Sequence, residues 1–283
     1  MQEIKTIAIA GAGTMGAGIA QVSAQAGYNT ILFDINLEML QKGKNSVENS
    51  LNSLLKKGKL SLEKKEEIQT KIKFTSEINE LKADLIIEAI VENLAIKQKF
   101  FKEVAELNSP ETILASNTSS IPLTQIAEKI SNPERVVGIH FFNPAPVMKL
   151  VEIISGEKTN PEIVEVCKKL LAGMGKTCVM AADSPGFIVN RVARLYYVES
   201  LKILEENVAT FEDIDLLLES SGFKMGPFRL MDLIGVDTNF SVTNSIYNLF
   251  NQASKFRPSK IQQQKVEAGF HGKKTGKGFY EYE

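Results

Sequence analysis

The sequence is poor in cysteine and histidine and has no tryptophan. Its 283 residues include two cysteines and two histidines. Cys167 and Cys178 form no CxxC pair, and two thiols in a chain of this length exclude a disulfide framework. We therefore interpret both as small apolar residues in a reducing compartment. Any chemistry that needs an imidazole must use His140 or His271.

The chain also lacks an excess of charge and a long apolar run. Lys and Arg number 33 against 34 for Asp and Glu, a net charge of −1, which gives no overall electrostatic reason to bind nucleic acid or an anionic membrane. No apolar run reaches the ~18 residues that a membrane helix needs. The chain starts with a strand-like segment instead of a charged and then apolar leader, so we expect a cytoplasmic protein.

Short apolar runs alternate with helical patterns through the first two thirds of the chain. Two helical stretches, 37–57 and 61–71, are expected to pack as a hairpin. Alternating strands and helices predict an α/β domain with a doubly wound, mainly parallel sheet. The expected strands are 4–10, 30–33, 85–90, 112–115, 135–140, 150–154 and 177–181.

After Asp183 the pattern becomes helical. We expect helices at 187–206, 237–251 and 259–268, another one capped by Thr210, and at most a short strand at 278–282. The sequence thus predicts two domains, an α/β domain over 1–183 and an all-helical C-terminal domain over 184–283.

A glycine-rich hexapeptide joins the first expected strand to the first helix: Gly11, Ala12, Gly13, Thr14, Met15 and Gly16. In this GxGxxG, Gly11 permits a tight turn, Gly13 lets a pyrophosphate approach the backbone, and Gly16 lets the helix pack on the strand. Asp34 ends the second strand, where a carboxylate binds the ribose hydroxyls of NAD and repels the 2′-phosphate of NADP. No arginine follows at 35 or 36. The pattern predicts a Rossmann-type domain that binds NAD.

His140 ends an apolar strand, at the edge of an open α/β sheet where ligands bind. Glu152 is an acid among apolar neighbours on the next strand, and a buried carboxylate needs a partner. A carboxylate on one imidazole nitrogen fixes the tautomer and leaves the other nitrogen available as a base. We expect His140 and Glu152 to form such a pair.

Two further segments leave alternatives open. The polar segment 116–120 follows another strand, and it either lines the same edge or forms an ordinary loop in which Ser120 caps the next helix. Asn190 falls about one turn into the helix 187–206, where it either faces a cleft or is an ordinary polar helix residue.

Taken together, these motifs resemble those of the bacterial 3-hydroxybutyryl-CoA and mitochondrial short-chain L-3-hydroxyacyl-CoA dehydrogenases, from Ile4 to Tyr282. The resemblance implies interconversion of (S)-3-hydroxyacyl-CoA, of short chain such as 3-hydroxybutyryl-CoA, and 3-ketoacyl-CoA with NAD(H), in fatty acid β-oxidation or butyrate-type metabolism. The segments that carry it are Gly11–Gly16, Glu88–Asn93, Ser116–Ser120, His140–Glu152, Pro185–Arg191, Met225–Phe228 and Lys274–Tyr280.

The resemblance also implies roles for single residues. His140 is similar to the family's general base and Glu152 to the acid that orients it, whereas Ser119 and Asn190 match residues that hydrogen-bond the substrate's oxygens. A homodimer through the C-terminal domain is implied as well. The implied cofactor contacts outside the glycine turn and Asp34 are Glu92, Lys97, Ser119, Asn143 and Lys274, and the implied CoA contacts are Ser50 and Lys57.

Two other functions remain as alternatives. A related dehydrogenase of a free sugar acid would need a buried arginine for the carboxylate, whereas CoA needs the exposed lysines Lys56 and Lys57. A structural or nucleotide-sensing protein with an inactive site would not need to keep all four of His140, Glu152, Ser119 and Asn190.

Overall fold

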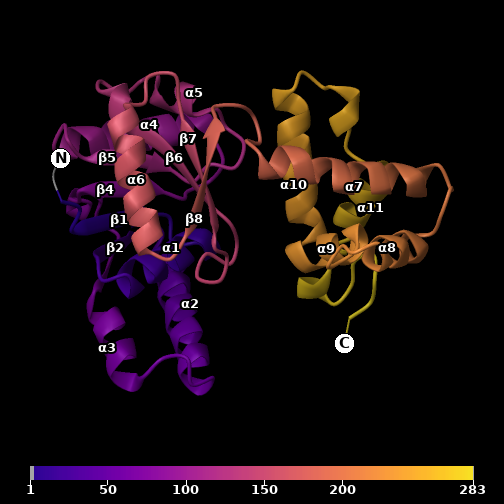
Figure 1. The fold of residues 1–283 in the computed structure, drawn as a ribbon, viewed down its shortest axis with the longest axis horizontal. Helices are drawn as coiled ribbons and strands as arrows, with labels where there is room; N and C mark the ends of the chain where they lie inside the picture. Colours follow the sequence, from indigo (N-terminus) through magenta and orange to yellow (C-terminus); the bar gives the residue numbers. More distant parts are fainter. Residues whose placement is uncertain (1–2, 283) are drawn as a thin grey trace. The chain divides into compact units, whose positions relative to one another are not determined.

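The computed structural model describes residues 3–282. The chain divides into two compact units, Met1–Ser184 and Pro185–Glu283, which are described one at a time. Figure 1 shows an α/β unit at the N-terminal end and a helical unit at the C-terminal end. Within residues 3–282, no helix is both long enough and apolar enough to cross a membrane.

The first unit is built on an eight-stranded sheet with the order β3-β2-β1-β4-β5-β6-β7-β8. Every neighbouring pair is parallel except β6 and β7, which run antiparallel. The mainly parallel sheet that the sequence predicts is confirmed. The strands are β1 Thr6–Ala10, β2 Asn29–Phe33, β3 Ile72–Thr75, β4 Leu85–Glu88, β5 Ile113–Ser116, β6 Val136–Phe141, β7 Leu150–Ser155 and β8 Thr177–Ala182.

One strand was not predicted and one considered strand is absent. The strand that was not predicted is β3, which has only four residues, with Ile72 and Phe74 alternating with polar residues. It starts almost directly after the polar helix α3, so no turn signal separates the two elements in the sequence. At the C-terminal end, the segment 278–282 forms no strand and contributes only an isolated bridge between Lys277 and Glu281. Runs this short carry too little periodicity to be assigned from the sequence.

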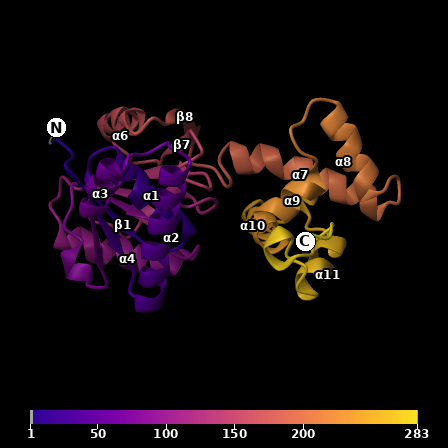
Figure 2. The same cartoon turned by 90° about the horizontal axis from the view of Figure 1, so that it is seen from below.

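Helices cover both faces of this sheet, as the two views in Figures 1 and 2 indicate. Every position of β4, β5 and β6 is buried, which requires cover on both sides. Each fully buried side chain such as Ile9 or Leu85 contributes about 1.5–3 kcal/mol through removal from water. The helices are α1 Thr14–Gln25, α2 Leu37–Lys56, α3 Leu62–Thr70, α4 Leu94–Leu107, α5 Leu123–Ala127 and α6 Pro161–Gly173.

The strand order reverses at β1, which pairs with β2 on one side and with β4 on the other. In open α/β sheets, ligands bind beyond the carboxyl ends of the strands at such a point. The carboxyl ends of β4, β5 and β6 follow one another along this edge, since Glu88 pairs with Ser116 and Ser116 with Gly138. The fold therefore gathers the ends of the apolar strands at one ligand-binding edge.

The second unit is helical, as predicted. Thr210 caps α8, its side chain accepting from the Asp213 amide. Helix α9 was not predicted, because its eight residues lie between Gly226 and Gly235 and show no long amphipathic pattern. The helices of this unit are α7 Val189–Glu205, α8 Phe211–Ser220, α9 Pro227–Ile234, α10 Val236–Leu249 and α11 Lys260–Glu267, with 3₁₀ turns at Ser254–Phe256 and Lys273–Thr275. Two further 3₁₀ turns, Ile78–Glu80 and Pro133–Arg135, belong to the first unit.

Candidate active site

The glycine turn between β1 and α1 has the geometry of an anion site. Gly11 has φ +99°, and a Cβ there would lie 2.5 Å from the carbonyl oxygen of Ala89. A Cβ on Gly16 would overlap the carbonyl oxygen of Gly11, whereas a Cβ on Gly13 would meet nothing within 4 Å. Gly11 and Gly16 are thus required by packing, and Gly13 keeps space open above the start of α1.

No side chain caps α1, and its first turn carries no acid. The first amides of the helix and its dipole therefore remain available to an anion such as a pyrophosphate. Asp34, at the end of β2, accepts from the Ala12 amide (2.8 Å) and the Asn36 amide (2.9 Å). These bonds fix a carboxylate beside the turn, where it can accept hydroxyl groups. The open space at Gly13, the uncapped helix and the fixed acid fit a dinucleotide of the NAD type.

The predicted pair of His140 and Glu152 is present. His140 on β6 lies directly opposite Glu152 on β7 in the antiparallel register. The distance from His140 Nδ1 to Glu152 Oε2 is 2.7 Å, and both side chains are buried. Because the only antiparallel pair of strands in this sheet places the two residues opposite one another, the backbone itself sets their alignment.

The second imidazole nitrogen faces a hydroxyl. His140 Nε2 lies 3.0 Å from Ser119 Oγ, on the loop after β5. The same loop is tied to β6 by Asn117, whose side-chain oxygen accepts from the Phe141 amide (2.8 Å). Ser119, His140 and Glu152 thus form a continuous row in which the nitrogen that faces Ser119 is the one that can exchange a proton with a substrate.

Glu92 holds the loop that carries Ser119. Its Oε1 accepts from the amides of Ser119 (3.0 Å) and Ser120 (3.1 Å) and from the hydroxyls of Thr118 (2.6 Å) and Ser120 (3.0 Å). Burial by itself would raise the pKa of Glu92, but Lys97 and these hydroxyls outweigh it and the pKa is lowered. A charged Glu92 therefore fixes the backbone on which Ser119 depends.

Behind Glu92 lies a buried ion cluster. Lys97, which is 1% exposed, has its ammonium 3.2 Å from Glu92 and 2.5 Å from Glu88 at the end of β4. Glu88 also accepts from the Ser116 hydroxyl (2.7 Å) and the Ile90 amide (2.8 Å), while its burial raises its pKa. The cluster links the ends of β4 and β5 to the loop beside His140.

Ser120 does not cap the helix that follows it. Its hydroxyl bonds to Glu92, and the first amides of α5, Leu123 and Thr124, donate to Asp183 at 2.6 and 2.7 Å. The interpretation of 116–120 as an ordinary loop with Ser120 as its cap is therefore wrong. The cap comes from sixty positions away, which no local pattern can indicate.

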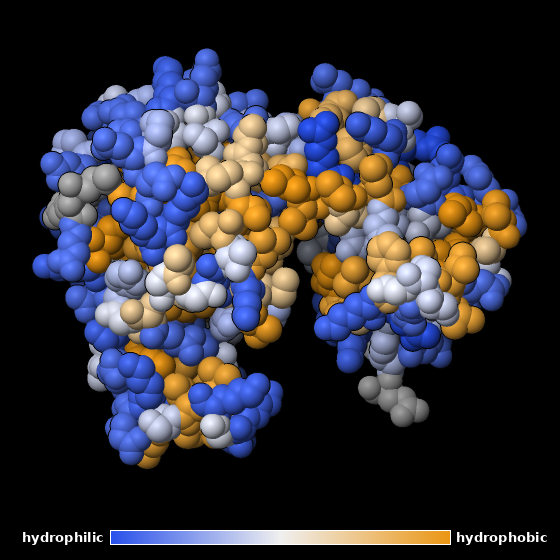
Figure 3. All heavy atoms as spheres, viewed as in Figure 1, coloured by the Kyte–Doolittle hydropathy of each residue, from blue (hydrophilic) through white to orange (hydrophobic). Residues whose placement is uncertain are grey.

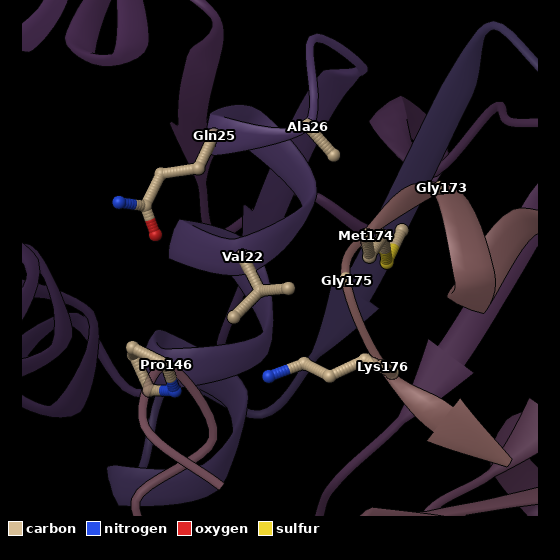
Figure 4. A pocket seen from close by; sticks show the side chains of 8 residues that line it. All are labelled: Val22, Gln25, Ala26, Pro146, Gly173, Met174, Gly175 and Lys176. Carbon is tan, nitrogen blue, oxygen red and sulfur yellow. The ribbon is translucent and has the colours of Figure 1, made fainter. Parts of the chain in front are cut away.

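Asn143 lies in the exposed turn after β6. The turn is held by Lys176, whose ammonium donates to the carbonyls of Ala145 (2.6 Å) and Met148 (2.9 Å). Figure 4 shows Lys176 reaching toward Val22 and Pro146 across a cavity of about 280 Å³. Burial lowers the pKa of Lys176. This lysine fixes the position of the turn that carries Asn143.

The remaining predicted residues lie elsewhere on the two units. Ser50 is half-buried on α2, and Lys57 is exposed just after it, on the hairpin that Figure 1 shows projecting from the sheet unit. Asn190 lies in the first turn of α7, and Lys274 pairs with Asp237 at 2.7 Å in the helical unit. The roles that the resemblance gives these four residues stay predictions.

His271 takes no part in the row at His140. Its Nε2 lies 3.3 Å from the Val266 carbonyl and its Nδ1 3.8 Å from Asp237, both within the helical unit. The residues from 3 to 282 contain no cluster of three His, Cys, Asp or Glu side chains that could hold a metal ion.

Sequence reasoning missed the positioning residues. Glu88, Asn117 and Asp183 were part of named segments without a role, and Lys176 was not singled out. The available signal was an acid next to apolar strand residues, which holds for Glu88 at the end of β4 as much as for Glu152 within β7. The partners of Asp183 and Lys176 depend on tertiary contacts and leave no local trace.

Comparisons with known proteins agree with this geometry. The family model of the 3-hydroxyacyl-CoA dehydrogenase NAD binding domain matches residues 6–184, and that of the 3-hydroxyacyl-CoA dehydrogenase C-terminal domain matches residues 186–282. The chain is similar to a 3-hydroxyadipyl-CoA dehydrogenase of Escherichia coli, with 48% identity over 100% of the chain and 60% of that protein. The chain therefore spans 60% of that relative's length, which is less than two thirds.

Two further relatives match along their whole length. A probable 3-hydroxybutyryl-CoA dehydrogenase of Bacillus subtilis is 42% identical over 99% of the chain and 98% of that protein. The crystal structure of an (S)-3-hydroxybutyryl-CoA dehydrogenase from Ralstonia eutropha superposes with a TM-score of 0.92 and 39% identity, covering 99% of the chain and 100% of that structure.

Proposed function

Because the chain belongs to the 3-hydroxyacyl-CoA dehydrogenase family and carries its NAD-binding domain, we propose that it interconverts (S)-3-hydroxyacyl-CoA and 3-ketoacyl-CoA with NAD(H). The observation that carries the proposal is the row formed by half-buried Ser119 and the buried pair of His140 and Glu152 at the ligand-binding edge of the sheet. Membership of this family favours a CoA thioester substrate over the alternative, in which the chain would oxidise a free sugar acid.

In the oxidation direction, His140 Nε2 takes the proton of the 3-hydroxyl as the C3–H bond breaks. NAD supplies the acceptor for the hydride from C3. Glu152, 2.7 Å from Nδ1, keeps the imidazole in the required tautomer and stabilises the imidazolium that forms. In the reverse direction, the imidazolium returns the proton to the oxygen at C3. Ser119 supplies a hydroxyl that orients this oxygen toward Nε2.

The finer assignments are part of the same proposal. We expect Asn143, Glu92, Lys97 and Lys274 to support the cofactor, and Asn190 to bind the substrate's oxygens. Lys97 would act through Glu92, since it is 1% exposed and already engaged by two carboxylates.

The exposed hairpin of α2 and α3 is the candidate binding site for the CoA moiety of the substrate. Lys56 and Lys57 are exposed there, and no carboxylate of the described residues pairs with either ammonium. Free ammonium groups at the tip of a hairpin suit the phosphates of CoA. The two unpaired cysteines suit a reducing compartment such as the cytoplasm.

Steady-state rates of NADH oxidation with 3-ketoacyl-CoA chains of four to sixteen carbons test the function. We expect turnover that is highest for short chains, and (S)-3-hydroxyacyl-CoA as the product. Absence of turnover with every chain length, or turnover with free sugar acids instead, would overturn the proposal.

A further inference from the structure

Asp183 connects three parts of the sheet unit at one point. It follows β8 directly, and its carboxylate accepts from the Leu123 amide (2.6 Å), the Thr124 amide (2.7 Å) and the Thr124 hydroxyl (2.6 Å). The Thr124 oxygen in turn accepts from the Glu157 amide (3.1 Å), in the turn after β7. The end of β8, the start of α5 and the turn after β7 are thus joined through the side chains of Asp183 and Thr124.

The helix α5 depends on these bonds because it is short. A helix of five residues is unstable by itself, and Pro122 at its N-cap position provides no side-chain hydrogen bond. Leu123 and Ile126 are fully buried, which fixes one face of the helix. Other residues of α5 border a cavity of about 370 Å³, together with the turn 156–159, so packing alone does not fix the start of the helix. The Asp183 carboxylate is the group that sets its position.

The loop that leads into α5 carries Ser119. Three residues separate Ser119 from the first residue of the helix. Within this loop the Thr118 hydroxyl oxygen accepts from the Ile121 amide (3.0 Å), which closes a compact turn around Ser119. Glu92 holds the turn itself, and Asp183 holds the helix that directly follows it. Two carboxylates from different parts of the chain therefore anchor the two ends of one short segment.

We propose that Asp183 is a positioning residue for the reaction. By holding the start of α5, it keeps the Ser119 hydroxyl 3.0 Å from His140 Nε2, where that hydroxyl orients the oxygen at C3 of the substrate. The inference rests on the proposed function and adds to it a residue that acts through Ser119. A displacement of about 1 Å in an orienting group can cost about 10²-fold in rate. Loss of the Asp183 carboxylate should therefore reach catalysis through Ser119.

A double-mutant cycle tests this, with the 3-ketoacyl-CoA on which the wild type turns over fastest. We expect Asp183→Ala to lower kcat/KM about 10- to 100-fold. The dissociation constant of NADH should stay within about threefold, since the glycine turn and Asp34 lie on other elements. In a Ser119→Ala background, Asp183→Ala should lower kcat/KM less than about threefold, because the group that it displaces is already absent. Asp183→Asn keeps an oxygen that can cap a helix and should restore most of the activity.

Asn160→Ala is the matched control, since Asn160 caps α6 in the same unit by accepting from the Glu162 amide (2.9 Å). It should lower the melting temperature by a few degrees, as Asp183→Ala does, but leave kcat/KM within about twofold. An Asp183→Ala effect of equal size with and without Ser119 overturns the inference, as does a variant that melts earlier with a normal kcat/KM. If Asp183→Ala does not fold, Asp183→Ser takes its place in the cycle.

Hydrogen exchange separates this inference from the proposed function, because it needs no turnover. The amides of residues 119–124 should exchange faster in Asp183→Ala than in the wild type, and at the wild-type rate in Asn160→Ala. Unchanged exchange in this segment would overturn the inference even in an active enzyme. Inactivity of the wild type with every 3-ketoacyl-CoA would instead overturn the proposed function, and the exchange rates would still decide whether Asp183 holds the loop.

Discussion

The two imidazole nitrogens of His140 contact residues on two other segments of the chain. A histidine at the end of a strand has no specified tautomer until Glu152, on β7, binds Nδ1 at 2.7 Å. Ser119, on the loop after β5, then lies at Nε2. The type and position of these residues were predictable from the sequence, but the antiparallel register that places His140 opposite Glu152 was not.

We predict that Glu152→Gln lowers kcat by about 10- to 100-fold, because Gln keeps the shape but loses the charge that stabilises the imidazolium. The dissociation constant of NADH should stay within twofold, and the melting temperature close to that of the wild type. Steady-state kinetics, cofactor titration and thermal melting on one preparation check this. Glu157→Gln, at an exposed glutamate just after β7, is the control. A folding defect together with a normal kcat would contradict the prediction and show that Glu152 has a structural role only.

The exposed lysines at the C-terminal end of α2 are predicted to contribute to substrate binding and not to the chemical step. Replacing both Lys56 and Lys57 with Ala should raise KM for the CoA thioester about tenfold and change kcat less than twofold, since contacts to a remote part of the substrate are lost equally from ground and transition states. Replacing Lys102 and Lys129, two exposed lysines on the sheet unit, controls for the change in net charge. An unchanged KM in the hairpin variant would show that these lysines are ordinary solvent-exposed residues at the end of a helix and do not contact CoA.

At the scale of elements, the ends of β4 and β5 are joined by one ion cluster built on the buried pair of Glu88 and Lys97. Glu88 ends β4, Lys97 lies on α4, and Glu92 reaches the loop after β5. A strand end, a helix and the loop that carries Ser119 therefore depend on the same charges. This arrangement makes Glu88 a positioning residue for Ser119, although it touches neither Ser119 nor His140.

We predict that Glu88→Gln lowers the melting temperature by about 5 °C, because a buried ion pair loses one partner while Glu92 still compensates part of the Lys97 charge. It should also lower kcat several-fold, through displacement of the loop that carries Ser119. Glu80→Gln, at an exposed pair with Lys73, should change neither quantity. A variant that melts earlier but keeps its kcat would show that the cluster supports the fold alone.

Elements with long periodic patterns were predictable, and those fixed by distant contacts were not. The apolar strands, the hairpin of α2 and α3, and the cap at Thr210 follow from local residues. β3 and α9 are too short to show a period. The cap of α5 by Asp183 and the support of the Asn143 turn by Lys176 exist only in the folded chain.

At the scale of the whole molecule, we expect a homodimer through the helical unit. Several large apolar side chains of this unit are exposed, among them Leu216 (64%), Leu217 (69%) and Phe223 (52%), and Figure 3 shows apolar residues on its visible face. Exposed apolar clusters of this kind mark interfaces.

We predict that Leu216→Asp combined with Leu217→Asp converts the dimer into a monomer, as measured by sedimentation equilibrium. Leu62→Asp, at an exposed leucine on α3, should leave the dimer intact. A wild-type chain that sediments as a monomer would contradict the expectation, and so would a dimer that tolerates both aspartates.

The central claim is that one buried imidazole moves the proton while NAD(H) carries the hydride. The most direct test is the kcat of NADH oxidation for the wild type and His140→Gln, with the 3-ketoacyl-CoA on which the wild type turns over fastest. If His140 is the general acid–base as proposed, the variant should lose about 10²–10⁴-fold in kcat, with an unchanged dissociation constant for NADH. Turnover of His140→Gln within a few-fold of the wild type would contradict it.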